Sequence, residues 1–452
     1  MFRRSRSMFN HDRKQARLGI SLGWVLVFAA PLLGQSGPNF PLSHARLKNG
    51  LEVIFSEDTS LPIVSVAVVY NVGSVHESSG KAGLAYIMEN LMFSGSANVA
   101  PFQHFNFINR VGGELSASTS EDKTLFYQTV PSNQLAPVLW LESDRMKSLE
   151  ISEGAFERAR NALLDDLLQK KSELYFASQL SFDQLVYSDF AHSHPVLGTE
   201  EDVRNLTVDD ARNFYANYYV PNNAVLCITG NFNMLSAREL VDRYFETIPR
   251  GKDVGPSFEP PVYTRQPVVR TFQDVLAAAP AFYMGFRIAP PFSNDFYTLS
   301  IVDYILFRGR SSRLTRRLLG RDNKIAYQAS GGIEKRKDRA IYRIFCVVNN
   351  QAMAVRCQEA IFSELDRLKR VVLSEPDLVR YKTMFKQDYL NRFSSTMDKA
   401  IFLCESFLAL KNFDDFPLEL DKYMKVTSTD IIGIVNRYFT LDNSIILNVK
   451  TK

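Results

Sequence analysis

Apolar residues in the first half of this chain follow two patterns, one typical of strands and one typical of helices. From Leu61 to Val72 they run almost without interruption and are rich in valine, which predicts a buried strand. From 84 to 92, after Gly83, they recur at helical spacing, so we expect a helix with one face in a core. An Asn-Gly pair divides 45–55 into two short apolar stretches, which predicts two strands joined by a turn.

The same apolar patterns predict four further elements. Strands are predicted at 123–130 and 224–229, and helices at 133–149 and 206–219.

The second half of the chain repeats these signals at a nearly constant distance. Thr207-Val208-Asp209-Asp210 recurs 220 residues later as Thr427-Ser428-Thr429-Asp430, and Asn223 recurs as Asn443. Likewise Ser152-Glu153 corresponds to Ser374-Glu375. We therefore predict an α+β fold of two homologous domains, each a mostly antiparallel β-sheet packed with α-helices.

Chain length and composition agree with this division. A chain of 452 residues exceeds one ordinary core, and 46% hydrophobic with 23% charged residues is typical of a folded globular protein. A stretch rich in Pro and Gly at 251–267 is the predicted linker. It separates an N-terminal domain, 38–250, from a C-terminal domain, 268–452, and residues 1–37 form a separate leading segment.

Charge is concentrated in that leading segment. Six basic residues and Asp12 give the first 17 residues a charge of +5, whereas the whole chain carries +4, so the rest is close to −1 and offers no basic surface for nucleic acid. The uncharged stretch Leu18 to Gly37 follows and contains the apolar run 24–30. This pattern is typical of a secretory signal. The alternative is a retained membrane anchor, although Pro31 breaks the run. We expect an exported protein, periplasmic or extracellular, that contacts a membrane only through this segment if it is retained.

The cysteines show no close pair of the metal-binding or redox kind. Cys227 and Cys346 lie in apolar, strand-like runs, which favours buried thiols, and a disulfide stays open as an alternative. The full set is Cys227, Cys346, Cys357 and Cys404.

The helix at 84–93 has the frame of a metal-binding helix. At 3.6 residues per turn, Tyr86, Glu89 and Asn90 share one face. A zinc peptidase of the inverted type has His at the first and last of these positions to hold zinc, with Glu between them as general base. Here the Glu is present and both histidines are replaced.

The segments around this helix carry a resemblance. They resemble the pitrilysin/insulinase family of zinc metallopeptidases (inverzincins) from about residue 44 to the C-terminus, and the matching segments are 71–74, 93–96, 112–119, 140–146 and 156–161. The family's third zinc ligand is a Glu, and its position falls on Asp166. At Ser116, active members carry an Asn that holds the substrate backbone.

This resemblance implies a degenerate zinc site. A Tyr86 phenol is a poor ligand at neutral pH, and the Asn90 amide is a neutral donor that suits harder cations than zinc. Only Asp166 offers an anionic group, one methylene shorter than Glu. We therefore expect no metal in this chain and assign it no catalytic residue, because Glu89 without a zinc-activated water has no proton to take.

Two other groups are candidates. His192 and His194 are two apart, which would place both on one side of an extended strand as half a metal site, but the segment 192–198 is similar to a structural loop of the family. Arg313 and Tyr327 are similar to the family's Arg/Tyr pair, which binds substrate: Arg presents a fork of donors, and the Tyr hydroxyl donates to an oxyanion. In the structural alternative, Arg313 lies on the solvated side of a helix at 311–319, and Tyr327 is an aromatic residue of the core.

An erased zinc site beside an Arg/Tyr pair is similar to the non-catalytic subunits of two-chain members of this family. The resemblance implies a substrate-binding subunit of a zinc metalloendopeptidase, with the zinc in a homologous partner chain and a peptide as substrate. One alternative is a structural or binding protein without peptide processing. The other is an active enzyme that uses Glu89 and Asp166 with an unusual metal.

Overall fold

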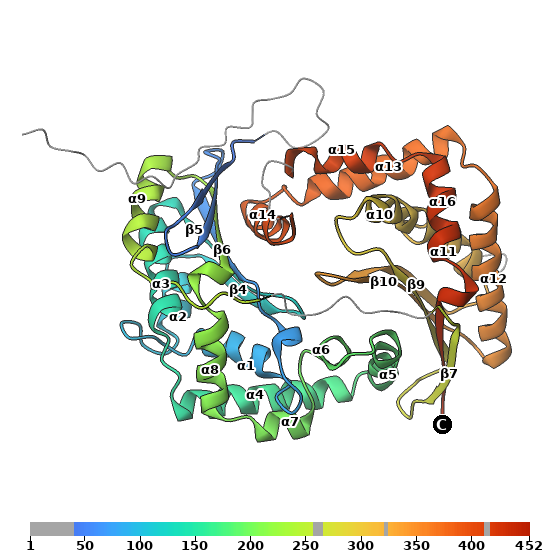
Figure 1. Ribbon diagram of the computed structural model, residues 1–452, viewed down its shortest axis with the longest axis horizontal. Helices are drawn as coiled ribbons and strands as arrows, with labels where there is room; N and C mark the ends of the chain where they lie inside the picture. The colour runs from blue at the N-terminus through green and yellow to red at the C-terminus, as the bar shows by residue number, and fades with distance from the viewer. Residues whose placement is uncertain (1–39, 256–264, 321–323, 411–415) are drawn as a thin grey trace, which may run out of the picture.

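The computed structural model describes residues 40–255, 265–320, 324–410 and 416–452, which form two halves, each built around one sheet (Figure 1). The first sheet has the strand order β1-β2-β6-β3-β5-β4 and the second β7-β11-β8-β10-β9. In each sheet one neighbouring pair runs parallel, β2 with β6 and β7 with β11, and the other pairs are antiparallel. The first-sheet strands are β1 (Ser43–Arg46), β2 (Glu52–Glu57), β3 (Ile63–Tyr70), β4 (Glu114–Thr119), β5 (Thr124–Pro131) and β6 (Ala224–Gly230). The second-sheet strands are β7 (Val268–Gln273), β8 (Ala281–Ile288), β9 (Gln328–Lys335), β10 (Ala340–Val347) and β11 (Ser444–Lys450).

Helices cover these sheets and confirm the predicted α+β class. In the first half they are α1 (Leu84–Leu91), α2 (Gln103–Arg110), α3 (Leu135–Ser148), α4 (Glu153–Lys171), α5 (Phe176–Val186), α6 (Phe190–Ser193), α7 (Glu200–Asn205), α8 (Val208–Tyr218) and α9 (Met234–Phe245). In the second half they are α10 (Asn294–Leu306), α11 (Arg313–Leu319), α12 (Gln351–Arg370), α13 (Glu375–Asn391), α14 (Thr396–Leu410), α15 (Glu419–Met424) and α16 (Ser428–Tyr438).

The repeated sequence signals are helix caps. Thr207 accepts a hydrogen bond from the amide of Asp210 while the Asp210 carboxylate accepts one from the amide of Thr207, and this capping box starts α8. Thr427 and Asp430 start α16 in the same way. The repeat is therefore visible in the sequence because the same cap is needed at the same point of each half.

Each half covers the sheet of the other with one helix. Helix α14, from the second half, packs on β3 and β6 of the first sheet, and α5, from the first half, packs on β7, β8 and β11 of the second. Thr396, at the start of α14, accepts a hydrogen bond from Ser65 at 2.9 Å through its hydroxyl and one from Thr229 at 2.6 Å through its carbonyl. Because α5 and α14 lie 220 residues apart, they are equivalent helices, exchanged between the halves.

This exchange bears on the predicted division of the chain. The two sheets divide between 230 and 268, on either side of the predicted linker, of which residues 256–264 lie outside the described part. The domain boundaries at 250 and 268 stay a prediction, since α5 and α14 cross between the two sheets. The predicted signal segment, 1–37, also lies outside the described residues.

The four cysteines are free and buried, as predicted for Cys227 and Cys346. Burial, with the Cys227 thiol alongside, raises the pKa of the Cys404 thiol. Across the described residues, every helix is too short or too polar to cross a bilayer.

Candidate functional site

Helix α1 is held in place from its first turn. Gly83, just before it, has a φ of 95°, a conformation that favours glycine, and a Cβ there would lie 2.9 Å from the carbonyl oxygen of Leu197. The buried carboxylate of Glu77 accepts hydrogen bonds from the amides of Gly83 at 3.0 Å and Ala85 at 2.7 Å, satisfying donors that an α-helix leaves free at its start. His194 contacts the same carboxylate at 3.0 Å. These contacts fix where the polar face of α1 points.

That face brings two of the predicted positions together. The Tyr86 hydroxyl donates a hydrogen bond to the Asp166 carboxylate on α4, with 2.9 Å between the oxygens. Burial raises the pKa of Tyr86, and the hydrogen bond to Asp166 raises it further. The phenol therefore stays neutral, and its proton occupies the carboxylate that a metal would need.

The other two positions are engaged elsewhere. Glu89 accepts a hydrogen bond of 2.6 Å from the hydroxyl of Thr119, at the end of β4, and burial raises the pKa of Glu89. The exposed amide of Asn90 lies 3.4 Å from the carbonyl oxygen of Tyr86, on its own helix. Asn90 therefore adds no charged donor to the site.

The donor set does not fit zinc. Catalytic zinc sites use three His or carboxylate ligands, and here Tyr86 and Asn90 replace two of them. Within the part of the chain that the structure describes, no group of three or more His, Cys, Asp or Glu side chains is placed to hold a metal ion. What the site holds instead is a closed hydrogen-bonded pair.

The two histidines of the 192–198 segment have different partners. An extended strand, which the half metal site would need, is not formed there, because residues 190–193 form the short helix α6. His192 contacts Asp189 at 2.5 Å, whereas His194 stacks on Phe190 and contacts Glu77. The pair is therefore no half metal site, and its contacts support the structural interpretation.

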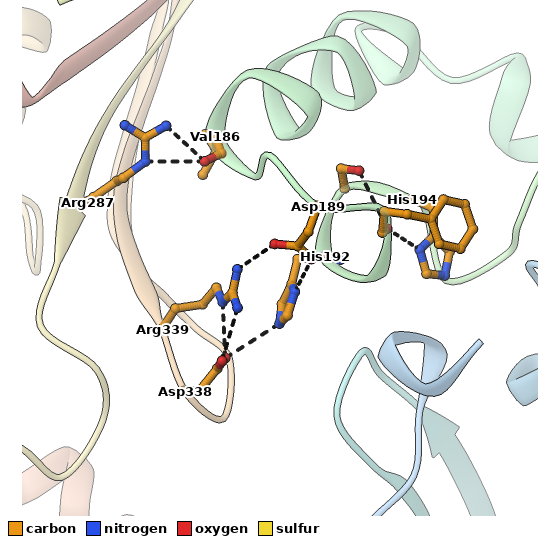
Figure 2. Close-up of polar contacts among 9 residues, drawn as sticks. Val186, Asp189, His192, His194, Arg287, Asp338 and Arg339 are labelled. Carbon is orange, nitrogen blue, oxygen red and sulfur yellow. Dashed lines mark hydrogen bonds and ion pairs between the residues drawn. The ribbon is translucent and has the colours of Figure 1, made fainter. Parts of the chain in front are cut away.

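His192 belongs to a cluster that joins the two halves (Figure 2). The turn between β9 and β10 places Arg339 against Asp189 at 2.8 Å, and Asp338 lies 3.5 Å from His192. In the same turn, the amide of Lys337 donates to Asp122 of the first half at 2.7 Å. This turn, residues 336–339, therefore holds the second half against the first, and we call it the latch.

The contribution of Arg339 to this latch can be measured. Arg339→Ala should weaken the contact between the halves by about 1–2 kcal/mol, because Asp189 and Asp338 lose a charged donor. We expect faster amide hydrogen exchange in α6 and a larger radius of gyration in solution scattering. Lys170→Ala, which removes an exposed ion pair with Glu173, is the control and should change neither. Unchanged exchange in α6 would contradict a latch.

The two residues of the predicted Arg/Tyr pair differ in their exposure and in their contacts. Tyr327, just before β9, is 58% exposed and so is not the core aromatic of the structural alternative. Arg313 opens α11, and its guanidinium forms an ion pair with Glu364 of α12 at 2.9 Å, with the side chain 16% exposed. Tyr327 is free to meet a ligand, whereas Arg313 would first have to leave Glu364.

Two positioning residues carry no sequence signal. Glu77 lies six residues before Gly83 without a motif, and Thr119 is one of several hydroxyls in β4. Their roles depend on backbone amides and strand ends that meet only in the folded chain.

Two family models match this chain. The family model described as insulinase (peptidase family M16) matches residues 52–198, and that described as the peptidase M16 inactive domain matches residues 205–385. Together they cover most of the described chain.

Individual proteins agree over nearly the full length. The zinc protease PqqE of Helicobacter pylori is 24% identical over 441 residues, which are 95% of this chain and 97% of that protein. The crystal structure of a protease from Helicobacter pylori superposes with a TM-score of 0.83 and 23% identity, covering 91% of this chain and 100% of that one. The peptidase M16 inactive domain from Pseudomonas fluorescens gives a TM-score of 0.81 at 14% identity, with coverage of 91% and 98%.

Proposed function

Because this chain belongs to the insulinase family of peptidases, family M16, and carries Tyr86, Asn90 and Asp166 in place of zinc ligands, we propose that it is the non-catalytic, substrate-binding subunit of a two-chain zinc metalloendopeptidase. The zinc would belong to a homologous partner chain. The observation that carries this proposal is the hydrogen bond from Tyr86 to Asp166, which fills the site with a neutral phenol and a carboxylate already engaged.

In this proposal the chain contributes binding groups and no hydrolysis. Tyr327 is exposed, and its hydroxyl can donate to a peptide carbonyl, while β4 and β9 are the edge strands of the two sheets, where a peptide can add as a further strand. The basic and apolar N-terminal sequence supports export to the periplasm or the extracellular space.

The test is activity with and without a partner. We expect the purified chain alone to show no chelator-sensitive cleavage of a fluorogenic peptide library, and the chain mixed with a zinc-bearing homologue from the same source to cleave it. Strong cleavage by the lone chain that a chelator abolishes would overturn the proposal.

The ion pair of Arg313 favours a second candidate, a structural or binding protein without peptide processing. An arginine held by Glu364 has a structural role already.

Paired variants separate the two candidates. If Arg313 binds substrate, Arg313→Ala should lower the activity of the mixture about tenfold or more, while Glu364→Gln, which frees the guanidinium, should not. Tyr327→Phe should lower activity in the same assay, because it removes a single hydroxyl. Arg313→Ala and Glu364→Gln could instead have the same small effect, and Tyr327→Phe none. In that case the chain does not bind peptide through these residues, and the second candidate is favoured.

A further inference from the structure

Two of the free cysteines meet where the halves are joined by an exchanged helix. Cys227 is on β6 of the first sheet, and Cys404 is on α14, the helix from the second half that covers β3 and β6 (Figure 1). Both side chains are fully buried, and their thiols form a hydrogen bond with each other. A sulfur from each half is therefore in contact with one from the other.

The main chain of α14 lies close to the sheet at this contact. The Cys404 sulfur is 3.7 Å from the carbonyl oxygens of Ala67 on β3 and Val225 on β6. Ala67 is the residue opposite Cys227 in the β3–β6 ladder, so Cys404 lies beside Cys227 along the strands as well. Small side chains permit this approach, because Ala67 and Ala400, one turn before Cys404, are fully buried. A disulfide needs such a short separation of the two main chains.

The other exchanged helix is held in a different way. Helix α5 contacts the second sheet through the ring of Phe182, which stacks on Tyr283 at 5.2 Å. Exchange of a helix therefore does not by itself require cysteines. The remaining two, Cys346 of β10 and Cys357 of α12, both belong to the second half. A bond between these two would leave the halves unlinked, whereas a bond between β6 and α14 would join them.

We propose that Cys227 and Cys404 form a reversible disulfide that locks α14 onto the first sheet and joins the two halves covalently. The oxidant is another disulfide, such as oxidised glutathione. The thiolate of one cysteine attacks this donor and releases half of it, and the thiolate of the other cysteine then attacks the mixed disulfide and releases the second half. The cysteines lose two electrons and two protons, and the donor becomes two thiols. Because both sulfurs are buried, this exchange takes place before α14 docks or when it opens.

The disulfide changes both stability and local opening. It closes a long loop of the chain, which constrains the unfolded state more than the folded one. We expect the oxidised chain to melt roughly 5 °C or more above the reduced chain. Amides of α14, β3 and β6 should exchange more slowly in the oxidised chain, while β8 and β11, covered by α5, serve as the internal control. This goes beyond the pairing with a zinc-bearing chain, since it needs no partner.

Refolding of the full chain in mixtures of oxidised and reduced glutathione tests the bond. After an acid quench and unfolding, alkylation counts the thiols that remain. We expect all four cysteines to be labelled after refolding with reduced glutathione, and only the two outside the proposed bond after refolding with the oxidised form. Mass mapping of peptides should link Cys227 to Cys404. Dithiothreitol should restore full labelling and lower the melting temperature again.

Variants assign the effect to this pair. Cys227→Ala and Cys404→Ala should each abolish the link and the difference in melting temperature between oxidised and reduced chain. Cys346→Ala, which removes another buried cysteine, is the matched control and should keep both. Thermal denaturation with reductant shows whether each variant is folded. Full labelling at every glutathione ratio, a link between Cys346 and Cys357 in place of the proposed one, or equal melting temperatures of the linked and reduced chains would overturn the proposal.

Discussion

The triple variant Tyr86→His, Asn90→His and Asp166→Glu is expected to bind one zinc ion per chain, and the natural chain is expected to bind none tightly. The frame for the site is present, because α1 packs on α4 and the side chains of Tyr86 and Asp166 already meet at 2.9 Å. What is missing is the donor chemistry. Two imidazoles and a longer carboxylate supply it, and we expect a dissociation constant in the micromolar range or below, about 8 kcal/mol of binding free energy.

Elemental analysis and competition with a zinc-sensitive dye measure this change. The matched control adds Glu89→Gln to the triple variant. Because Glu89 is the general base in this motif and no ligand, zinc binding should persist while any gained hydrolysis is lost. If the natural chain already carries one tightly bound zinc, and Asp166→Asn removes it, the degenerate-site interpretation fails and with it the proposed division of labour.

The sequence was sufficient for the elements near the degenerate site. Period and caps predicted α1, β3 and α8, since these signals are local and agree with the packing of each segment. The family resemblance also placed Tyr86 and Asp166 at one site, but the hydrogen bond between them was not predicted.

What the sequence did not predict depends on contacts between distant segments. The ion pair of Arg313 with Glu364 joins α11 to α12 and leaves no pattern in either helix. The exchange of α5 and α14 was likewise missed, because an apolar helix face does not reveal which sheet it will cover.

Because α5 and α14 are exchanged, a substitution in α5 should destabilise the second half of the protein. Phe182→Ala in α5 is expected to destabilise the protein by about 3–5 kcal/mol, although α5 comes from the first half and the packing it loses is in the second. Phe182 is fully buried, its ring stacks on Tyr283 of β8 at 5.2 Å, and the guanidinium of Arg343 lies 5.0 Å from its centre. Truncation leaves a cavity under the second sheet, and it removes the ring beneath a buried arginine.

Chemical denaturation measures the loss, and hydrogen exchange shows where it falls. We expect the amides of β8 and β11 to lose protection first, because α5 covers these strands, while β3 and β6 under α14 keep theirs longer. Phe105→Ala on α2 is the matched control: its ring is 47% exposed, so the free energy of unfolding should change by less than about 0.5 kcal/mol. If Phe182→Ala instead loosens only the first half, α5 does not contribute to the second core, and the reciprocal exchange of helices is wrong.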